Sequence, residues 1–288
     1  MDVGIGLPAT IPGIERDPLL DWARRAEQRG FSSLGTIDRL VYPNLEPLVA
    51  LAAAAAVTER IRLMTDILLA PLRGNGALLA KQAATLETIS GGRLTLGVAV
   101  GGRPDDYDAA DVPLHERGRL MDGLLEELRQ VWAGEQRGFA GAIGPPPVRP
   151  GGPELLIGGN ADPVIRRVAQ FGDGWTMGGG PPDRFGETAE RVRAAWSEAG
   201  REGEPRLVAL RYFALGDGAR EGADRYVHHY YAIAGDEVAG QIAASVATDA
   251  KTTQGDRDAF AGAGADELIY FPCSRDPAQV DLLADAVL

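Results

Sequence analysis

The stretch Lys81–Gly102, KQAATLETISGGRLTLGVAVGG, decides the fold class. Its first nine residues, Lys81–Ile89, read as a helix with one apolar face. Ser90–Gly92 ends that helix, because glycine readily adopts the left-handed conformation found at helix C-termini. Arg93 then opens LTLGVAV, an apolar run that is typical of a strand covered on both faces of a parallel sheet. A helix, a tight turn, a buried strand and a glycine-rich exit make half of an α/β repeat.

The same alternation of short apolar strands and amphipathic helices continues in both directions along the chain. We expect eight strands, at Val3–Leu7, Phe31–Ile37, Ile61–Leu69, Leu94–Val100, Glu154–Ile157, Gly174–Met177, Arg206–Leu215 and Glu267–Phe271. Eight strands, each followed by a helix, is the count of a TIM barrel. We therefore predict one (β/α)8 barrel of class α/β over residues 1–288. A doubly wound open sheet is the alternative, but it usually carries Gly-x-Gly-x-x-Gly after the first strand, where this chain has GLPATIPG.

Several connections are predicted as well. Asp17 is expected to cap a helix at Pro18–Arg29, and Asp183 to cap one at Arg184–Ala199. Asp105–Val112 is expected to be a loop. Residues 133–153 are rich in glycine and proline, so they form either a loop or a domain boundary, and we favour a loop because the α/β alternation resumes at once.

The composition limits the classes of function. The chain has 288 residues, 29 Lys and Arg against 41 Asp and Glu, and a net charge of −12, which disfavours nucleic-acid binding. No run of 18 apolar residues predicts a membrane span, and MDVGIGLP does not resemble a signal peptide. Cys273 is the only cysteine, which fits a reducing cytoplasm. We expect a cytoplasmic protein without nucleic-acid or membrane partners.

Charged residues at the predicted strand ends are the candidate catalytic groups. In a barrel these ends surround one pocket. Asp38 and Arg39 follow the second strand, where they would form an ion pair, a structural contact at the barrel rim or a catalytic pair. Asp66 places a carboxylate inside an otherwise apolar strand. Because burial without a partner is costly, Asp66 should meet Arg39, Arg73, a ligand or water.

Glycine-rich strand ends are the candidate binding elements. Gly158, Gly159 and Asn160 lead into a helix beginning near Pro163, whose free N–H groups suit a phosphate. A second run follows the sixth strand at Gly178, Gly179 and Gly180. The plainer interpretation is that these glycines only make tight turns. No nucleophile elbow, P-loop or zinc motif is present, so we predict no metal site and expect a bound cofactor to supply the chemistry.

One helix gathers histidines and tyrosines in the string HHYY, residues 228–231. Helical spacing predicts a buried face made of Tyr226, Tyr230 and Ile233, with His229 facing solvent. The functional alternative is that these tyrosines and histidines line an aromatic substrate pocket.

Six segments in this order resemble the bacterial luciferase-like flavin-dependent oxidoreductases: AEQRGFSSLGTIDRL, AAAAAVTERIRLMTDILLAPLR, LLAKQAATLETISGGRLTLGVAVGG, PLHERGRLMDGLLEELRQVWAG, LLIGGN and FGDGWTMGGGPPDRF. The resemblance implies a TIM barrel that binds reduced FMN or a reduced deazaflavin at its mouth. It places a bulge, often with a non-proline cis peptide, behind the flavin ring at Thr65, Asp66 and Ile67. It also implies that ring and phosphate are flanked by Val100, Gly101, Gly102, Gly158, Gly159 and Asn160, with Gly178, Gly179 and Gly180 on the phosphate side.

The chain departs from the family at several positions. Many relatives have Asp-His where this chain has Asp38-Arg39, so a histidine acid/base is not expected. Luciferase has an arginine at the position of Val100, so backbone N–H groups or Arg103 would hold the phosphate. Segment 133–153 is short for the family, which would leave the pocket more open. The sugar-phosphate dehydrogenases of the deazaflavin branch carry a glutamate after the fourth strand, which GVAVGGRPDDY lacks.

Residues and resemblance together predict a monooxygenase that uses reduced FMN and O2 on a small or aromatic organic substrate. A separate flavin reductase would supply the reduced flavin, since no NAD(P) motif is visible. Arg39 would stabilise negative charge on the reacting oxygen or the substrate, with Asp38 orienting Arg39. A homodimer through the barrel helices is expected. The alternatives are a deazaflavin-dependent reductase or dehydrogenase on the same fold, and a non-catalytic flavin-binding protein.

Overall fold

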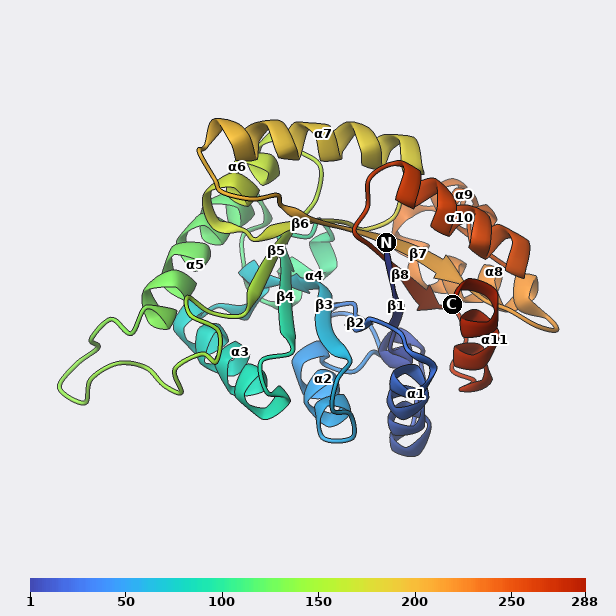
Figure 1. The fold of residues 1–288 in the computed structure, drawn as a ribbon, viewed down its shortest axis with the longest axis horizontal. Helices are drawn as coiled ribbons and strands as arrows, with labels where there is room; N and C mark the ends of the chain where they lie inside the picture. The colour runs from blue at the N-terminus through green and yellow to red at the C-terminus, as the bar shows by residue number, and fades with distance from the viewer.

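Eight parallel strands close into a barrel in the computed structural model, which describes residues 1–288 (Figure 1). The strands follow chain order around the barrel, and β1 closes it by pairing with β8. The predicted (β/α)8 fold is thereby confirmed. The strands are β1 (Asp2–Gly6), β2 (Ser33–Thr36), β3 (Arg62–Leu69), β4 (Leu94–Ala99), β5 (Glu154–Gly158), β6 (Gly174–Met177), β7 (Arg206–Phe213) and β8 (Glu267–Pro272).

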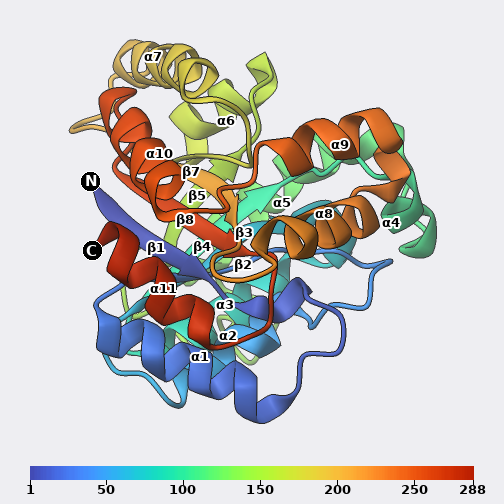
Figure 2. The ribbon, with the colours of Figure 1, turned by 90° about the vertical axis from the view of Figure 1, so that its right-hand side faces the viewer.

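A ring of helices covers the outside of the barrel. Figure 2 shows α4, α8 and α9 gathered at the end of the barrel opposite to the two chain termini, which is the end where the strands finish. The helices are α1 (Arg16–Arg29), α2 (Pro47–Ala55), α3 (Gly76–Ser90), α4 (Pro104–Ala109), α5 (Arg117–Trp132), α6 (Asp162–Phe171), α7 (Pro182–Glu198), α8 (Ala219–Tyr230), α9 (Asp236–Ala244), α10 (Ala250–Gly262) and α11 (Ala278–Val287).

Helix α4 corrects one prediction, because Asp105–Val112 was expected to be a loop. Proline at its first position and Asp105 and Asp106 in its first turn are the features that start a helix. The two predicted caps are also wrong. Glu15 precedes α1 and Pro181 precedes α7, so Asp17 and Asp183 lie within the first turns. There their charges favour the helix N-termini without capping them.

Residues 81–102, the stretch that decides the fold, form the predicted helix, turn and strand. Helix α3 ends where Gly91 takes the left-handed conformation, with φ 69° and ψ 38°. Strand β4 is buried along almost its whole length, since β3 and β5 pair with its edges and helices cover its outer face. Leu94, Leu96 and Val98 belong to the main hydrophobic core.

The left-handed cap at Gly91 leads to a first prediction. Gly91→Ala should lower the free energy of unfolding by about 1 kcal/mol, because a Cβ is disfavoured at this φ. The space around the new Cβ is open, so no steric clash adds to that cost. Gly123, inside α5 and also in open space, is the matched control. Gly123→Ala should stabilise by roughly 0.5–1 kcal/mol. Urea unfolding measures the change in the free energy of unfolding for each variant. A change of the same sign in both would contradict the left-handed cap at Gly91.

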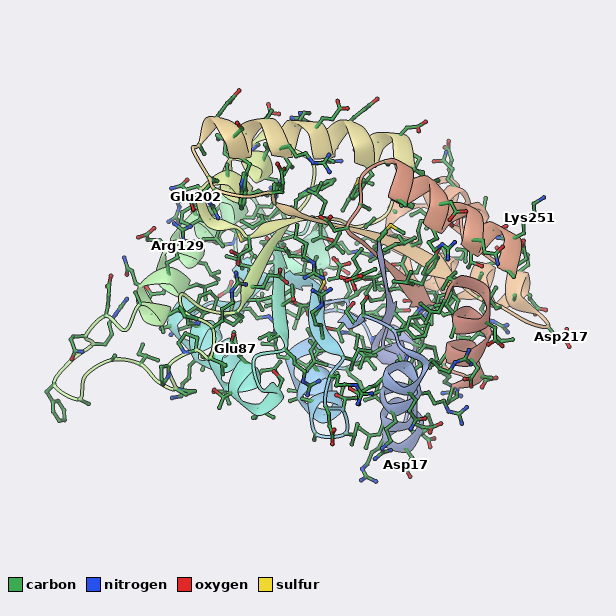
Figure 3. All side chains as sticks on the ribbon, viewed as in Figure 1. Asp17, Glu87, Arg129, Glu202, Asp217 and Lys251 are labelled. Atoms are coloured by element: carbon green, nitrogen blue, oxygen red, sulfur yellow. The ribbon has the colours of Figure 1, made fainter.

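Residues 133–153 make an irregular connection between α5 and β5 that extends from the barrel at the left of Figure 1. Glu87 of α3 anchors its far end: the buried carboxylate accepts hydrogen bonds from the N–H groups of Val148 (2.8 Å) and Arg149 (3.3 Å). Figure 3 shows Glu87 at the base of this connection.

None of the helices is long and apolar enough to cross a membrane.

Candidate functional site

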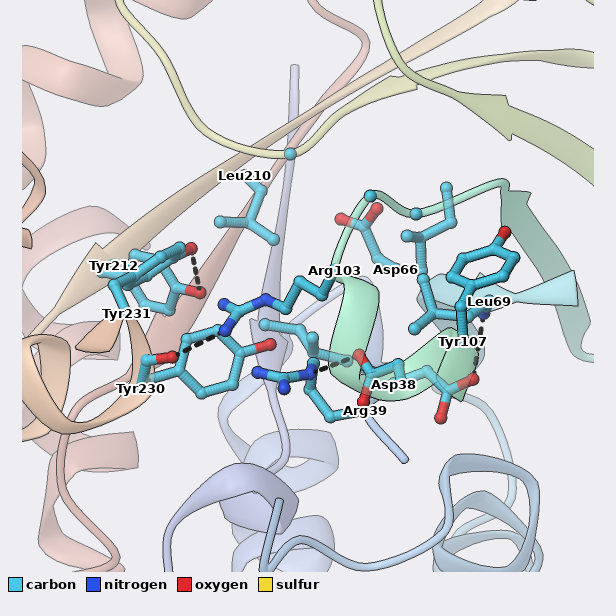
Figure 4. Close-up of a pocket in the computed structure, with 16 residues that line it drawn as sticks. Asp38, Arg39, Asp66, Leu69, Arg103, Tyr107, Leu210, Tyr212, Tyr230 and Tyr231 are labelled. Carbon is cyan, nitrogen blue, oxygen red and sulfur yellow. Dashed lines mark hydrogen bonds and ion pairs between the residues drawn. The ribbon is translucent and has the colours of Figure 1, made fainter. Parts of the chain in front are cut away.

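A cleft of about 220 Å³ lies at the C-terminal ends of the strands (Figure 4). Its wall is built from the ends of β2, β3, β4, β6 and β7, from α4 and from the C-terminal end of α8. The residues that line it are Ile37, Asp38, Arg39, Asp66, Ile67, Leu69, Gly101, Gly102, Arg103, Asp106, Tyr107, Gly178, Leu210, Tyr212, Tyr230 and Tyr231.

One wall of the cleft is formed by a bulge in β3. The pairing of β3 with β4 changes register between Thr65 and Leu68, and the Asp66–Ile67 peptide is cis. The Thr65 hydroxyl donates to the carbonyl of Gly97 (2.7 Å), and a Cβ at Gly97 would lie 2.1 Å from the Thr65 carbonyl oxygen. Glycine in β4 therefore lets the bulge lie close to it. The predicted bulge is confirmed, and it brings Asp66 and Ile67 to the cleft wall.

Asp66 is buried, and its two carboxyl oxygens differ. Oδ1 accepts a hydrogen bond from the Thr176 hydroxyl (2.8 Å), whereas Oδ2 is buried without a partner. Burial raises the pKa of Asp66 to about 7, and the negative charge of Glu267 adds to the rise. Neither Arg39 nor Arg73 reaches this carboxyl group, although the sequence predicted one of them as a possible partner. A ligand with a hydrogen-bond donor would satisfy Oδ2.

Of the three roles predicted for Asp38 and Arg39, the ion pair between the two is wrong. Asp38 accepts hydrogen bonds from Arg73 (2.6 Å) and from the N–H of Leu69 (2.9 Å). Arg39 donates instead to Asp106 (2.6 Å) and Asp105 (3.0 Å). These two neighbours thus have separate partners. Asp38 therefore does not orient Arg39. Burial raises the pKa of Asp38, and Arg73 opposes that rise.

Arg103 and a group of tyrosines form the wall opposite Asp66 in Figure 4. The Arg103 guanidinium lies 4.8 Å from the ring centre of Tyr230 and 5.3 Å from that of Tyr231. It also donates a hydrogen bond to the Tyr230 carbonyl (3.0 Å). The hydroxyl groups of Tyr212 and Tyr231 are 3.0 Å apart. This wall thus combines aromatic faces, hydroxyl groups and a positive charge.

The structure brings together part of the predicted cofactor set. Asp66, Ile67, Gly101, Gly102, Arg103 and Gly178 line the cleft, together with Asp38 and Arg39. A neighbouring cavity of about 270 Å³, which shares Gly178, is lined by Gly179, Gly180 and Arg184. The remaining predicted residues lie outside the lining of both: Thr65, Val100, Gly158, Gly159 and Asn160.

Two of these outer positions have local structural roles. A Cβ at Gly158 would lie 2.1 Å from the Ile67 side chain, so this glycine leaves the room that Ile67 needs beside the bulge. The Val100 carbonyl accepts a hydrogen bond from the Tyr107 hydroxyl, which fixes the exit of β4 against α4. Both positions shape the cleft wall from behind it.

Some residues that line the cleft were not predicted. Asp106 and Tyr107 line the cleft from α4, and the Arg-Pro-Asp-Asp sequence at its start was the available signal for that helix. Helix α8 and the residues after it match the predicted buried face only in part. Tyr226 and Tyr230 are buried as predicted, but Tyr230 also lines the cleft, and Ile233 is 50% exposed. His229 is exposed as predicted, with its Nδ1 2.7 Å from the Tyr42 hydroxyl.

Comparison with known proteins adds to this geometry. The sequence profile of the luciferase-like monooxygenase family matches residues 1–274. The chain belongs to this family. It is 32% identical over 237 residues to a protein of Mycobacterium tuberculosis, covering 71% of this chain and 81% of the relative.

Two further proteins are similar to the chain, one in sequence and one in fold. The pyrimidine monooxygenase RutA of Stutzerimonas stutzeri is 27% identical over 222 residues, covering 72% of this chain and 60% of RutA. An F420-dependent secondary alcohol dehydrogenase, solved with an F420-acetone adduct, superimposes with a TM-score of 0.80 at 18% identity, covering 99% of this chain and 98% of that one. At that identity the likeness shows the fold. Membership of the luciferase-like monooxygenase family indicates that this chain is an oxidoreductase.

No group of three or more His, Cys, Asp or Glu side chains is arranged to hold a metal ion.

Proposed function

We propose that this protein is a monooxygenase that uses reduced FMN and O2 to oxygenate a small or aromatic organic substrate at the barrel mouth. The observation that carries the proposal is Asp66 Oδ2, a buried acceptor without a partner on the wall of a cleft. Such an atom calls for a hydrogen-bond donor from a ligand, and the ring system of a reduced flavin carries N–H groups. Gly101 and Gly102 leave the backbone bare on the same wall, which suits a flat ring.

The phosphate of the cofactor would bind beyond this wall. Gly178, Gly179 and Gly180 lead directly into α7, whose first N–H groups and helix dipole favour an anion. The exposed Arg184, in the first turn of α7, lines the same cavity. When bound, the flavin supplies the activation of oxygen. The protein holds the ring, keeps water from it and presents at Asp66 a carboxyl group whose pKa of about 7 lets it hold or release a proton.

The monooxygenase reading is supported by the family and by RutA, which is a monooxygenase by name. The F420-dependent dehydrogenase supports the alternative, hydride transfer by a reduced deazaflavin on the same barrel. A non-catalytic flavin-binding protein is the second alternative. It would retain flavin without consuming O2 in response to any substrate.

An anaerobic titration separates these functions. The purified protein is titrated with FMNH2 and, separately, with the reduced deazaflavin coenzyme, and O2 is then admitted. We expect selective binding of FMNH2, followed by a slower return of the oxidised-flavin absorbance than free FMNH2 shows. Selective binding of the deazaflavin with no response to O2 would favour hydride transfer. Failure to bind either cofactor would overturn the proposal.

Two partners belong to the same proposal. A separate flavin reductase in the cytoplasm would supply FMNH2. A second copy of the chain would pack on the face made by α2 and α3, where Val49 and Leu78 are 68% and 52% exposed. Sedimentation analysis at micromolar protein is expected to give a dimer, and a monomer would remove this part of the proposal.

A further inference from the structure

Of the two arginines that line the cleft, one is paired with carboxylates and the other is not. Asp38 is paired with Arg73, and Arg39 with Asp105 and Asp106. Arg103 lines the same cleft and has no carboxylate within salt-bridge distance. Its one hydrogen bond goes to the Tyr230 carbonyl at the C-terminal end of α8. A guanidinium has five N–H donors, so most of its donor capacity remains open.

The tyrosines around Arg103 add to its preference for an anion. In Figure 4 the Tyr230 hydroxyl points into the space between Arg39 and Arg103. Burial raises the pKa of this hydroxyl, so it stays protonated and able to donate. The rings of Tyr230 and Tyr231 meet edge to face, 4.9 Å apart, and line the cleft beside the guanidinium. A cation, a hydroxyl donor and aromatic faces thus converge on one wall.

We infer that this wall, made by Arg103, Tyr230 and Tyr231, binds the substrate as a planar organic anion, with its carboxylate or equally acidic ring group on Arg103 and its ring against the tyrosines. The inference rests on the proposed function, because it makes this anion the molecule that is oxygenated. A neutral analogue of the same shape would leave the guanidinium without its charged partner, so the cleft should discriminate by charge.

Benzoate and benzamide are suitable probes, because they differ in charge and hardly in shape. Calorimetric titration of the wild-type protein is expected to show benzoate binding at least tenfold more tightly than benzamide. Arg103→Gln should weaken benzoate binding by about 10- to 100-fold, the range for a hydrogen bond to a charged group, and leave benzamide unchanged. Arg225→Gln is the matched control, because Arg225 is a 73% exposed arginine on α8, outside the cleft.

A second variant keeps the inference testable if Arg103→Gln does not fold. Tyr230→Phe retains the ring and removes only the hydroxyl, and it should weaken benzoate binding several-fold. Equal affinity of the wild-type protein for benzoate and benzamide would overturn the inference. Unchanged benzoate binding in a folded Arg103→Gln variant would also overturn it. If that variant does not fold, unchanged benzoate binding in Tyr230→Phe would do the same.

The competing role for Arg103 is the cofactor phosphate. Titration of wild-type and Arg103→Gln proteins with FMNH2 and with reduced riboflavin decides this, since the two ligands differ by the phosphate. We expect the preference for FMNH2 to survive in the variant, and its loss would reassign Arg103 to the cofactor. Charge-selective binding of benzoate by a protein that binds neither reduced cofactor would retain the anion site and reject the proposed function.

Discussion

Asp66→Asn is expected to make the protein more stable than the wild type at pH 8 and to remove most of its activity. Burial raises the pKa of Asp66 from an ordinary value near 3.8 to about 7. The folded protein therefore keeps a proton that the unfolded chain releases between these two pH values. The stability that protonated Asp66 contributes is fully present below the pKa of the unfolded chain, and it is lost as pH rises through the pKa of the folded protein. Three pKa units correspond to roughly 4 kcal/mol.

Asparagine has the shape of the protonated acid and no charge. The Thr176 hydroxyl can still donate to its carbonyl oxygen, as it donates to Asp66 Oδ1. Urea unfolding should therefore give similar free energies for Asp66→Asn and wild type at pH 4, and a clear advantage for the variant at pH 8. Asp217→Asn, which changes an exposed carboxylate (Figure 3), is the control and should show no such divergence.

The activity of Asp66→Asn should move in the opposite direction. If Asp66 exchanges a proton during oxygenation, its loss should lower kcat by about 100- to 10,000-fold, the usual contribution of a positioned acid or base. FMNH2 binding should also weaken, because the amide oxygen accepts from Thr176 and the amide NH2 at the place of Oδ2 cannot accept a hydrogen bond from the flavin. Wild-type turnover in Asp66→Asn would remove Asp66 from the chemistry while leaving the stability argument intact.

The barrel was predictable from the sequence because burial imposes a pattern on the chain. Strand β4 is apolar except for Thr95 because pairing and helices cover it, and the glycine at 91 marks a turn that few other residues allow. The short helix α4 escaped because its six residues carry no apolar periodicity, only a proline and two acidic residues at the start. Patterns report burial well and short polar elements poorly.

The position of the cleft was predictable from the sequence, but the ion pairs within it were not. Strand ends meet at the barrel mouth in any (β/α)8 fold, so Asp38, Arg39 and Asp66 were rightly expected near one another. Which carboxylate faces which guanidinium depends on side-chain direction and on segments distant in sequence. Arg39 and Asp106 are 67 residues apart, and nothing local links them.

The pair of Arg39 and Asp106 gives the other large expected effect. Both side chains are almost fully buried, at 4% and 1% exposure, and Asp106 also accepts from the N–H groups of Leu40 (3.0 Å) and Val41 (2.7 Å). Arg39→Ala should lower the free energy of unfolding by about 3–5 kcal/mol, because it leaves the buried Asp106 charge without a cation. Asp106→Ala should cost less, because Asp105 still lies 3.0 Å from Arg39. The double variant should cost clearly less than the sum of the two.

Urea unfolding of the two single variants and the double variant completes the cycle. Arg225 and Glu221 are the matched control, since this exposed pair on α8 lies 3.9 Å apart and should couple by less than about 1 kcal/mol. A strong coupling at Arg39 and Asp106 would mean that Arg39 holds the segment after β2 on α4, and that lost activity in Arg39→Ala reflects a displaced cleft wall. An Arg39→Ala variant of unchanged stability that binds FMNH2 but no longer oxygenates would instead assign Arg39 the catalytic role predicted from the sequence.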